Sequence, residues 1–161
     1  MVRVGLALAM AIVSVARVGA ADQKDSLEGV WRFQEEVDHR ADGSTVVTGP
    51  SLGYDGLLIF TANGYMSSTL LPKGRRWTLD TVSAAELKEA YGASSAHAGR
   101  YKVDPKSGAI NIEAIVSLDP SEEGTWSPVN YSLAADTLTL SGPWTYHGEK
   151  LTFTVRLARV K

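Results

Sequence analysis

Residues 56–68 have the sequence GLLIFTANGYMSS, in which two runs of strand length flank the dipeptide Asn63-Gly64. Asn-Gly supplies the positive φ angles of a type I′ turn, which tightly connects two antiparallel strands. The first run, LLIF, is apolar on both faces, so both faces of that strand are expected to be covered. The stretch predicts a β-hairpin, and with it an antiparallel β architecture.

The start of the chain differs in character from the rest. A basic residue precedes the apolar run GLALAMAIVSVA, which is too short to span a bilayer and is followed by small residues. This pattern is typical of a secretory signal peptide, with cleavage near Ala20 or Ala21. Arg17 is unusual at its position and leaves open a cytosolic protein with an apolar leader. We expect a signal peptide over residues 1–20, a single domain over residues 21–161, and a secreted or periplasmic location.

Charge and composition exclude several classes of function. The 161 residues include 16 Lys and Arg against 18 Asp and Glu, and loss of the two leader arginines leaves 14 against 18, a formal charge near −4. This acidic balance argues against binding to nucleic acid or to anionic membrane surfaces. The chain has no cysteine, which rules out disulfides and thiol chemistry, so an apolar core must stabilise the domain. Outside the leader, no apolar run has the length of a membrane-spanning helix.

The first long strand pattern covers residues 27–40. Trp31 and Phe33 alternate with polar residues and should face the core. Continued alternation places Glu35 on the same face as these aromatics and Glu36 on the opposite face.

One helix is expected, over residues 83–92. Ser83 and Glu86 form a capping box and Gly92 ends the helix. A helix of little more than two turns is marginal alone, so it needs an apolar surface to lie on. If the strands form a β-barrel, the natural place for the helix is across or beside one open end. The basic segment PKGRRW, residues 72–77, precedes it, and its simplest interpretation is a solvated loop.

The rest of the chain is a succession of strands separated by turn signals. They are expected near residues 45–48, 98–103, 110–118, 125–133, 137–141 and 151–160. About eight or nine strands in unbroken succession favour an all-β, antiparallel up-and-down barrel, while a Greek-key sandwich stays open as an alternative.

Several segments together carry a family resemblance. They are LEGVW at residues 27–31, the hairpin stretch, HAGRYKVD at 97–104, VSLDP at 116–120 followed by Gly124, and DTLTL at 136–140. With these segments the chain resembles the bacterial and fungal lipocalin-like domain family over nearly all of its mature length. The resemblance implies a calycin-type barrel with an internal cavity for a small, largely apolar molecule. Related proteins include passive binders and enzymes that fold a reactive substrate into a cyclised or isomerised product.

The chain departs from the family pattern at two positions. Glu113 stands where a His is expected, and Val129-Asn130 precede Tyr131 where the family usually has an Arg. Cavity chemistry that relies on that His and Arg is therefore in doubt here. The barrel itself needs neither residue for its turns or its core.

Glu113 has two interpretations. It alternates with Ile112 and Ala114, and the wholly apolar face of this strand is the obvious inward one, which would leave Glu113 in solvent. The resemblance instead implies a polar residue in the cavity at this position. There, apolar surroundings would raise the pKa of the carboxyl and make Glu113 the one weak catalytic candidate, for acid–base work.

Aromatic, thioether and hydroxyl side chains are the candidate ligand contacts. We select Tyr65, Met66, Ser67, Tyr91, His97, Tyr101, Ser117, Trp126 and Tyr131. The three histidines lie far apart and show no metal-binding spacing, so neither a metal nor another cofactor is expected.

Three functions remain open. The leading hypothesis is a binding protein that encloses a small hydrophobic molecule in the barrel cavity. The second is a cofactor-free cyclase or isomerase that holds a flexible substrate in a reactive shape. The third is a structural domain of an envelope assembly whose interior is filled by its own side chains.

Overall fold

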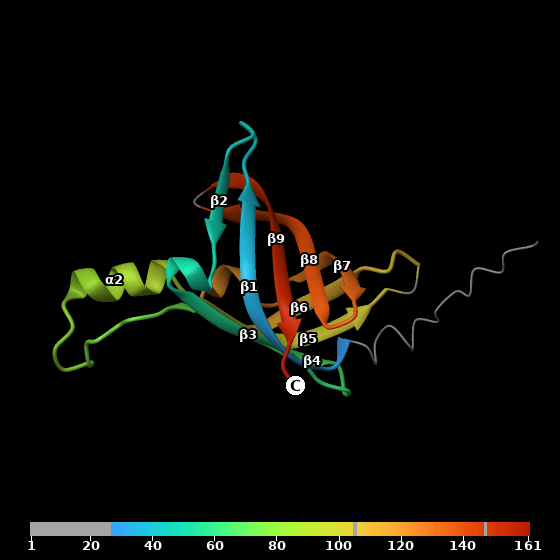
Figure 1. Cartoon of the computed structure of the whole chain (residues 1–161), viewed down its shortest axis with the longest axis horizontal. Helices are drawn as coiled ribbons and strands as arrows, with labels where there is room; N and C mark the ends of the chain where they lie inside the picture. Colours follow the sequence, from blue (N-terminus) through green and yellow to red (C-terminus); the bar gives the residue numbers. More distant parts are fainter. Residues whose placement is uncertain (1–26, 105, 147) are drawn as a thin grey trace, which may run out of the picture.

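In the computed structural model, residues 27–161 except 105 and 147 are described, and they form a closed antiparallel barrel (Figure 1). The strands are β1 (Gly29–His39), β2 (Thr45–Thr48), β3 (Tyr54–Phe60), β4 (Tyr65–Pro72), β5 (Ser95–Val103), β6 (Ile110–Ser117), β7 (Trp126–Ala134), β8 (Thr137–Tyr146) and β9 (Glu149–Arg159). One α-helix, α2 (Ala84–Gly92), and the short 3-10 helices η1 (Pro50–Leu52) and η2 (Pro120–Glu122) lie between strands.

Neighbouring strands pair in the order β2-β1-β3-β4-β5-β6-β7-β8-β9. An additional pairing of β1 with β9 closes eight of the nine strands into a barrel. The predicted up-and-down barrel is confirmed.

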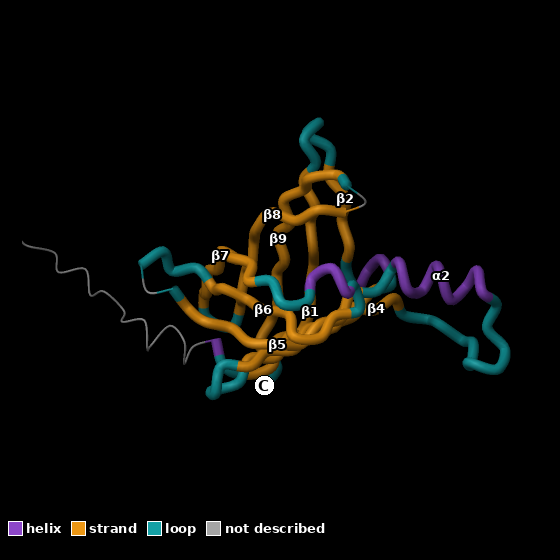
Figure 2. Tube along the Cα trace, turned by 180° about the vertical axis from the view of Figure 1, so that it is seen from behind, coloured by secondary structure: helices purple, strands orange, loops and turns teal. Residues whose placement is uncertain are grey.

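The barrel is built from two groups of strands that cross. Strands β1, β9 and β8 stand upright, and β3 to β6 run across them, in both Figure 1 and Figure 2. The first part of β1, Gly29 to Arg32, pairs with β3, whereas its last part, Glu36 to His39, pairs with β2 instead. The two groups are therefore joined along only part of β1, and they diverge toward the end of the barrel at which β1 ends.

The apolar end of the barrel is where β1 begins. Its interior is filled by a cluster of buried side chains, namely Leu27, Trp31, Leu58, Phe60, Met66, Tyr101, Ile110, Val129, Leu138, Leu140 and Leu157. The fully buried Trp31 donates a hydrogen bond from its indole Nε1 to the carbonyl of Leu27 (2.8 Å). The rings of Phe60 and Tyr101 meet edge to face with centroids 4.8 Å apart. The prediction that Trp31 and Phe33 face the core is confirmed, because Phe33 is also buried.

The hairpin of β3 and β4 forms as predicted, but its turn is of another type. Only Gly64 has a positive φ (86°), whereas a type I′ turn requires positive φ at both central residues. The amide of Gly64 donates to the carbonyl of Thr61 (3.0 Å), and the amide of Thr61 donates to that of Tyr65 (2.9 Å). This is the three-residue hairpin loop in which the last loop residue adopts the left-handed conformation. The type I′ assignment was wrong, although the strands it joins were correct.

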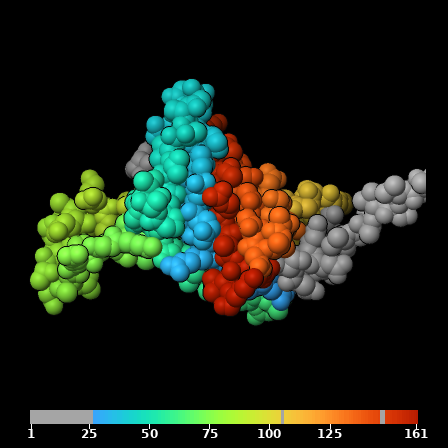
Figure 3. Space-filling view, in the orientation of Figure 1, coloured from blue at the N-terminus to red at the C-terminus, as the bar shows by residue number. Residues whose placement is uncertain are grey.

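The segment between β4 and β5 forms an arm, residues 73–92, that projects from the barrel (Figure 3). The capping box is present, since Ser83 Oγ accepts from the amide of Glu86 and the Glu86 carboxylate accepts from that of Ser83. No residue of α2 is buried, and Leu87 and Tyr91 are exposed. The expectation that the helix covers an apolar surface was therefore wrong. Instead, the capping box stabilises the first turn of α2, and a hydrogen bond from the Tyr91 hydroxyl to the carbonyl of Leu118 connects the helix to the end of β6.

The last hairpin is longer than the sequence predicts. Strand β8 was expected to end at residue 141, but its ladder with β9 continues through the pair Pro143 and Thr152 to Tyr146 and Glu149. The turn signal Ser141-Gly142-Pro143 does not break the strand. None of the helices in the described part of the chain is long and apolar enough to cross a membrane.

Replacing Gly64 with Val tests the turn. A side chain at a left-handed position is expected to lower the free energy of unfolding by about 1–2 kcal/mol, measured by urea denaturation. The control is Gly92→Ala, because Gly92 lies at the end of α2 with no positive φ and with open space around the added methyl group. That control should leave stability unchanged or raise it, and equal midpoints for Gly64→Val and the wild type would contradict the turn assignment.

Candidate functional site

The polar end of the barrel is where β1, β4, β6 and β8 end and β3, β5, β7 and β9 begin. Its inward-facing polar side chains are Glu36 and Asp38 on β1, Ser68 on β4, His97 on β5 and Ser117 on β6. All five are partly buried rather than exposed. The interior thus changes from a filled apolar cluster at one end to a group of polar side chains at the other.

A β-bulge turns two carboxylates of β1 toward the interior. Phe33 pairs with Leu157 of β9, but Glu35 pairs with the next residue, Arg156, so β1 has one extra residue at this point. Beyond the bulge Glu36 lies opposite Val155, which packs against the core cluster. Paired residues of antiparallel strands share a face, so Glu36 faces inward.

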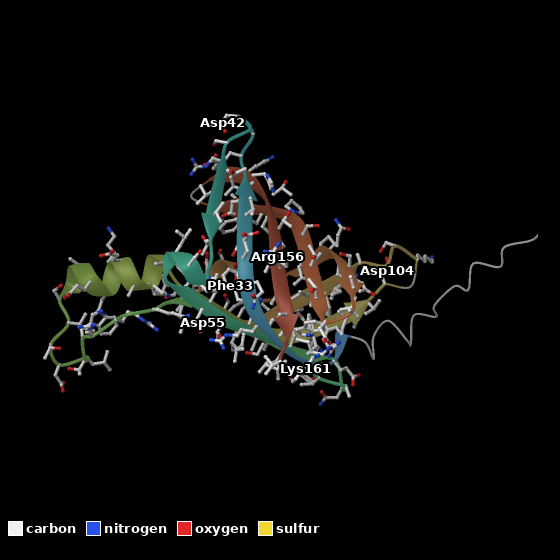
Figure 4. The ribbon with its side chains drawn as sticks, viewed as in Figure 1. Phe33, Asp42, Asp55, Asp104, Arg156 and Lys161 are labelled. Atoms are coloured by element: carbon white, nitrogen blue, oxygen red, sulfur yellow. The ribbon has the colours of Figure 1, made fainter. Side chains whose placement is uncertain are left out.

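The same bulge leaves Glu35 on the outer surface. Its carboxylate pairs with the guanidinium of Arg156 (3.5 Å), an exposed residue labelled on β9 in Figure 4. The sequence pattern predicts the opposite arrangement, with Glu35 inside and Glu36 outside, and that prediction was wrong.

Asp38 lies one pleat beyond Glu36, opposite Phe153. Its carboxylate accepts a hydrogen bond from the indole Nε1 of Trp144 on β8 (3.1 Å). Burial raises the pKa of Asp38, and the Trp144 hydrogen bond and the nearby His39 and Arg40 act in the opposite direction.

Glu36 is the more strongly perturbed of the two carboxyls. Burial, with a contribution from the negative charge of Asp38, raises its pKa from 4.5 to about 7. Among the described residues no ion pair or hydrogen bond involves the Glu36 carboxylate. A carboxyl of this kind that faces the barrel interior is a candidate functional group.

The facing wall contributes His97. Register places it beside Ser68 and Ser117 on the inward face. Its Nδ1 is buried and has no hydrogen-bond partner in the part of the chain that the structure describes. Burial lowers the pKa of His97, although the nearby carboxylate of Glu122 acts against this. At neutral pH the imidazole is therefore uncharged.

Ser117 is held in place by its own contacts. Its hydroxyl donates to the Glu122 carboxylate (2.7 Å), and its amide donates to that of Glu123 (3.1 Å). Both glutamates belong to η2 or its end, so η2 anchors this side of the polar end.

Four of the nine selected contact residues do not face the barrel interior. Tyr65 and Trp126 are exposed, and Ser67 lies on the outward row of β4. Tyr91 lies on the projecting arm. Tyr65, Ser67 and Trp126 each lie one position along their strand from a residue of the inward row.

The other five face inward but lie at different depths. Met66 and Tyr101 belong to the filled apolar cluster, and the hydroxyl of Tyr101 donates to the carbonyl of Thr61 (3.0 Å). Tyr131 packs against that cluster, with its hydroxyl oxygen buried and without a partner among the described residues. Only His97 and Ser117 lie at the polar end.

Glu113 lies on the outer wall, as the alternation on its strand predicts. Its carboxylate pairs with Arg100 across the β5–β6 ladder (2.7 Å). Trp126 lies opposite on β7, with the ammonium group of Lys102 4.7 Å from its ring centroid. Glu113 therefore contributes nothing to the polar end.

The described part of the chain has a hollow of about 670 Å³ that separates residues 72–77 from α2 and is lined by Arg75, Arg76 and Trp77, among others. Another hollow, of about 360 Å³, is lined by His97, Ser68 and Ser117 of the polar end together with neighbouring residues of β4, β5 and β6. In the described part of the chain, no three His, Asp or Glu side chains are grouped closely enough to hold a metal ion.

An eight-stranded antiparallel barrel that is closed by its first and last strands, β1 and β9, and in which β3 to β9 lie side by side in sequence order, defines the calycin class of up-and-down barrels. Residues 28–154 match the family model described as a lipocalin-like domain, so the chain belongs to the lipocalin-like domain family. A comparison with curated proteins found no match.

The pKa of Glu36 predicts how stability changes with pH. A rise from 4.5 in the unfolded chain to about 7 in the folded protein corresponds to about 3 kcal/mol at 1.36 kcal/mol per unit. The folded state holds this proton more tightly, so wild-type stability should fall as pH rises from 4.5 to 7. In Glu36→Gln this fall should be largely absent, as measured by urea denaturation between pH 4 and pH 8.

Glu35→Gln is the matched control, because its carboxylate lies outside beside Arg156. Its pH profile should keep the wild-type slope. Parallel profiles for Glu36→Gln and the wild type would show that Glu36 does not titrate in a buried environment.

Proposed function

We propose that this protein is a secreted or periplasmic carrier that binds a small, largely apolar molecule inside the polar end of its barrel. Family membership supports a ligand-binding barrel, and the leader pattern supports export, although the leader lies outside the described residues. The apolar part of the ligand would lie against half-buried side chains of the barrel wall, such as Leu70 and Phe153.

Unsatisfied interior polar atoms carry this proposal. Buried polar groups in folded proteins nearly always have hydrogen-bond partners. Within the described chain, His97 Nδ1 and Tyr131 Oη have none, and both side chains face the barrel interior. A ligand with a polar atom near His97 would supply the missing partner of this residue and be oriented by it.

The cyclase or isomerase hypothesis cannot use Glu113, the acid–base residue that the sequence suggests for it. Glu113 is paired with Arg100 on the outer wall, so it has no access to a molecule inside the barrel. An enzymatic role would have to use Glu36, whose pKa of about 7 suits proton transfer near neutral pH. The carrier function requires no reacting group and is the simpler proposal.

Leu70→Trp tests the location of the ligand. Leu70 lies on the inward row of β4 opposite Gly56, where a larger side chain would take up interior space. Binding of the neutral fluorescent probe N-phenyl-1-naphthylamine should weaken at least tenfold, while the protein retains cooperative thermal unfolding. Native mass spectrometry of the wild type purified from its own host should show a bound small molecule.

Leu57→Trp is the control, because Leu57 lies on the same hairpin but on its exposed outer face. Its probe affinity should equal that of the wild type. If neither the wild type nor the control binds the probe and no molecule accompanies the purified protein, the interior is filled and the structural-domain hypothesis holds.

A further inference from the structure

We propose that the ligand carries a protonated amine, which Glu36 and Asp38 bind at the polar end while the apolar body of the ligand extends into the barrel. This inference rests on the proposed ligand-binding function and specifies the chemical class of the ligand. It assigns a recognition role to two carboxyls on one inward face of β1.

The first argument is that no Arg or Lys of the described residues forms an ion pair with either carboxylate, although the charges of His39 and Arg40 act on Asp38 from a greater distance. In the described residues, Arg and Lys side chains within 4 Å pair with the carboxylates of Glu35, Asp55, Glu113, Asp136 and Glu149. None of these ion pairs involves Glu36 or Asp38. The two inward carboxylates of β1 are therefore available to pair with a cation of a ligand.

The second argument comes from the facing wall. His97 on β5 is the inward-facing imidazole of the polar end, and burial lowers its pKa, so it stays neutral near pH 7 and does not supply the cation. Its buried Nδ1 has no partner among the described residues, so it is available for a hydrogen bond with a polar atom of a ligand. A ligand bound between the two walls would contact both sides.

The third argument is the surroundings of the carboxyls. Phe153 lies opposite Asp38 on β9, and the indole of Trp144 donates to the Asp38 carboxylate. An ammonium group is attracted both by a carboxylate and by the face of a nearby aromatic ring. A metal ion fits less well, since no third carboxylate or imidazole is grouped with the pair in the described chain.

The energetic consequence is that an amine would offset the cost of burying the ionised Glu36 carboxylate. Burial disfavours the Glu36 carboxylate, which is why its pKa is raised to about 7. An ammonium group beside it would favour the ionised form and lower that pKa. Amine binding must therefore weaken as Glu36 becomes protonated at lower pH.

Three eight-carbon compounds that differ only in the head group test the inference on the full chain. Octylamine, octan-1-ol and octanoate are used at pH 8 to displace bound N-phenyl-1-naphthylamine. Octylamine should compete at a concentration at least tenfold lower than octanol, and octanoate should be the weakest competitor. In Glu36→Gln the preference for octylamine over octanol should fall to less than threefold, whereas Glu35→Gln should retain it.

The pH dependence provides a second readout. Octylamine stays protonated between pH 8 and pH 5, so a loss of its preference at pH 5 reports on the protein. The titratable and charged groups at this site are Glu36 and Asp38, with His39 and Arg40 acting on Asp38. On the facing strands they are His97, with Glu122 acting on it, and Tyr54, which lies on the inward row of β3. Protonation of His97 would also weaken octylamine binding at pH 5. Because Glu36→Gln keeps His97, the pH dependence that remains in this variant measures the contribution of His97, and it can be subtracted from that of the wild type.

The outcomes separate this inference from the function on which it rests. If the probe binds and octanol displaces it as well as octylamine does, the barrel is a carrier but the amine inference is wrong. A preference for octanoate, or an equal amine preference in Glu36→Gln and the wild type, would also overturn it. If the probe does not bind at all, the carrier function itself fails.

Discussion

The pairing of β1 with both β3 and β9 is the constraint on which the rest of the molecule depends. Without the β1–β9 ladder the strands would form an open sheet with two unpaired edges. The buried Trp31 on this strand fills the apolar end and fixes the chain before it by a hydrogen bond to Leu27. Closure and filling of the barrel are thus achieved by the same few residues of one strand.

The bulge in β1 divides the barrel interior into its two environments. Strand alternation would carry the Trp31 and Phe33 face on to Glu35, but the extra residue exchanges Glu35 for Glu36. A one-residue shift reverses every side chain beyond it, because side chains alternate with a period of two. Burial of a carboxylate is costly, and structures retain such groups mostly where they have a role. The inward carboxylate pair of the proposed site is the consequence of that inserted position, and a register shift between β5 and β6 turns Ser117 inward on the facing wall.

The departure of this chain from its family pattern becomes understandable in the structure. Glu113 replaces an expected histidine, and it pairs with Arg100 on the outer wall next to Trp126. The acidic groups of the interior are supplied instead by a strand on the other side of the barrel. Inward polar chemistry in this protein therefore depends on β1 and β5, and family membership alone does not locate it.

The sequence by itself determined which segments form strands, where the β3–β4 hairpin lies and where the helix begins, because alternation, turn residues and the capping box are local signals that hold wherever the chain lies. Trp31, Phe33 and the inward face of β6 up to Ala114 were predicted for that reason. Only the tertiary structure decided that Glu36 and Asp38 face inward, since the sequence QEEVDHR has no apolar period to mark a bulge. It likewise decided that Tyr65 and Trp126 face outward and that α2 projects, because inward and outward are defined only once β1 meets β9.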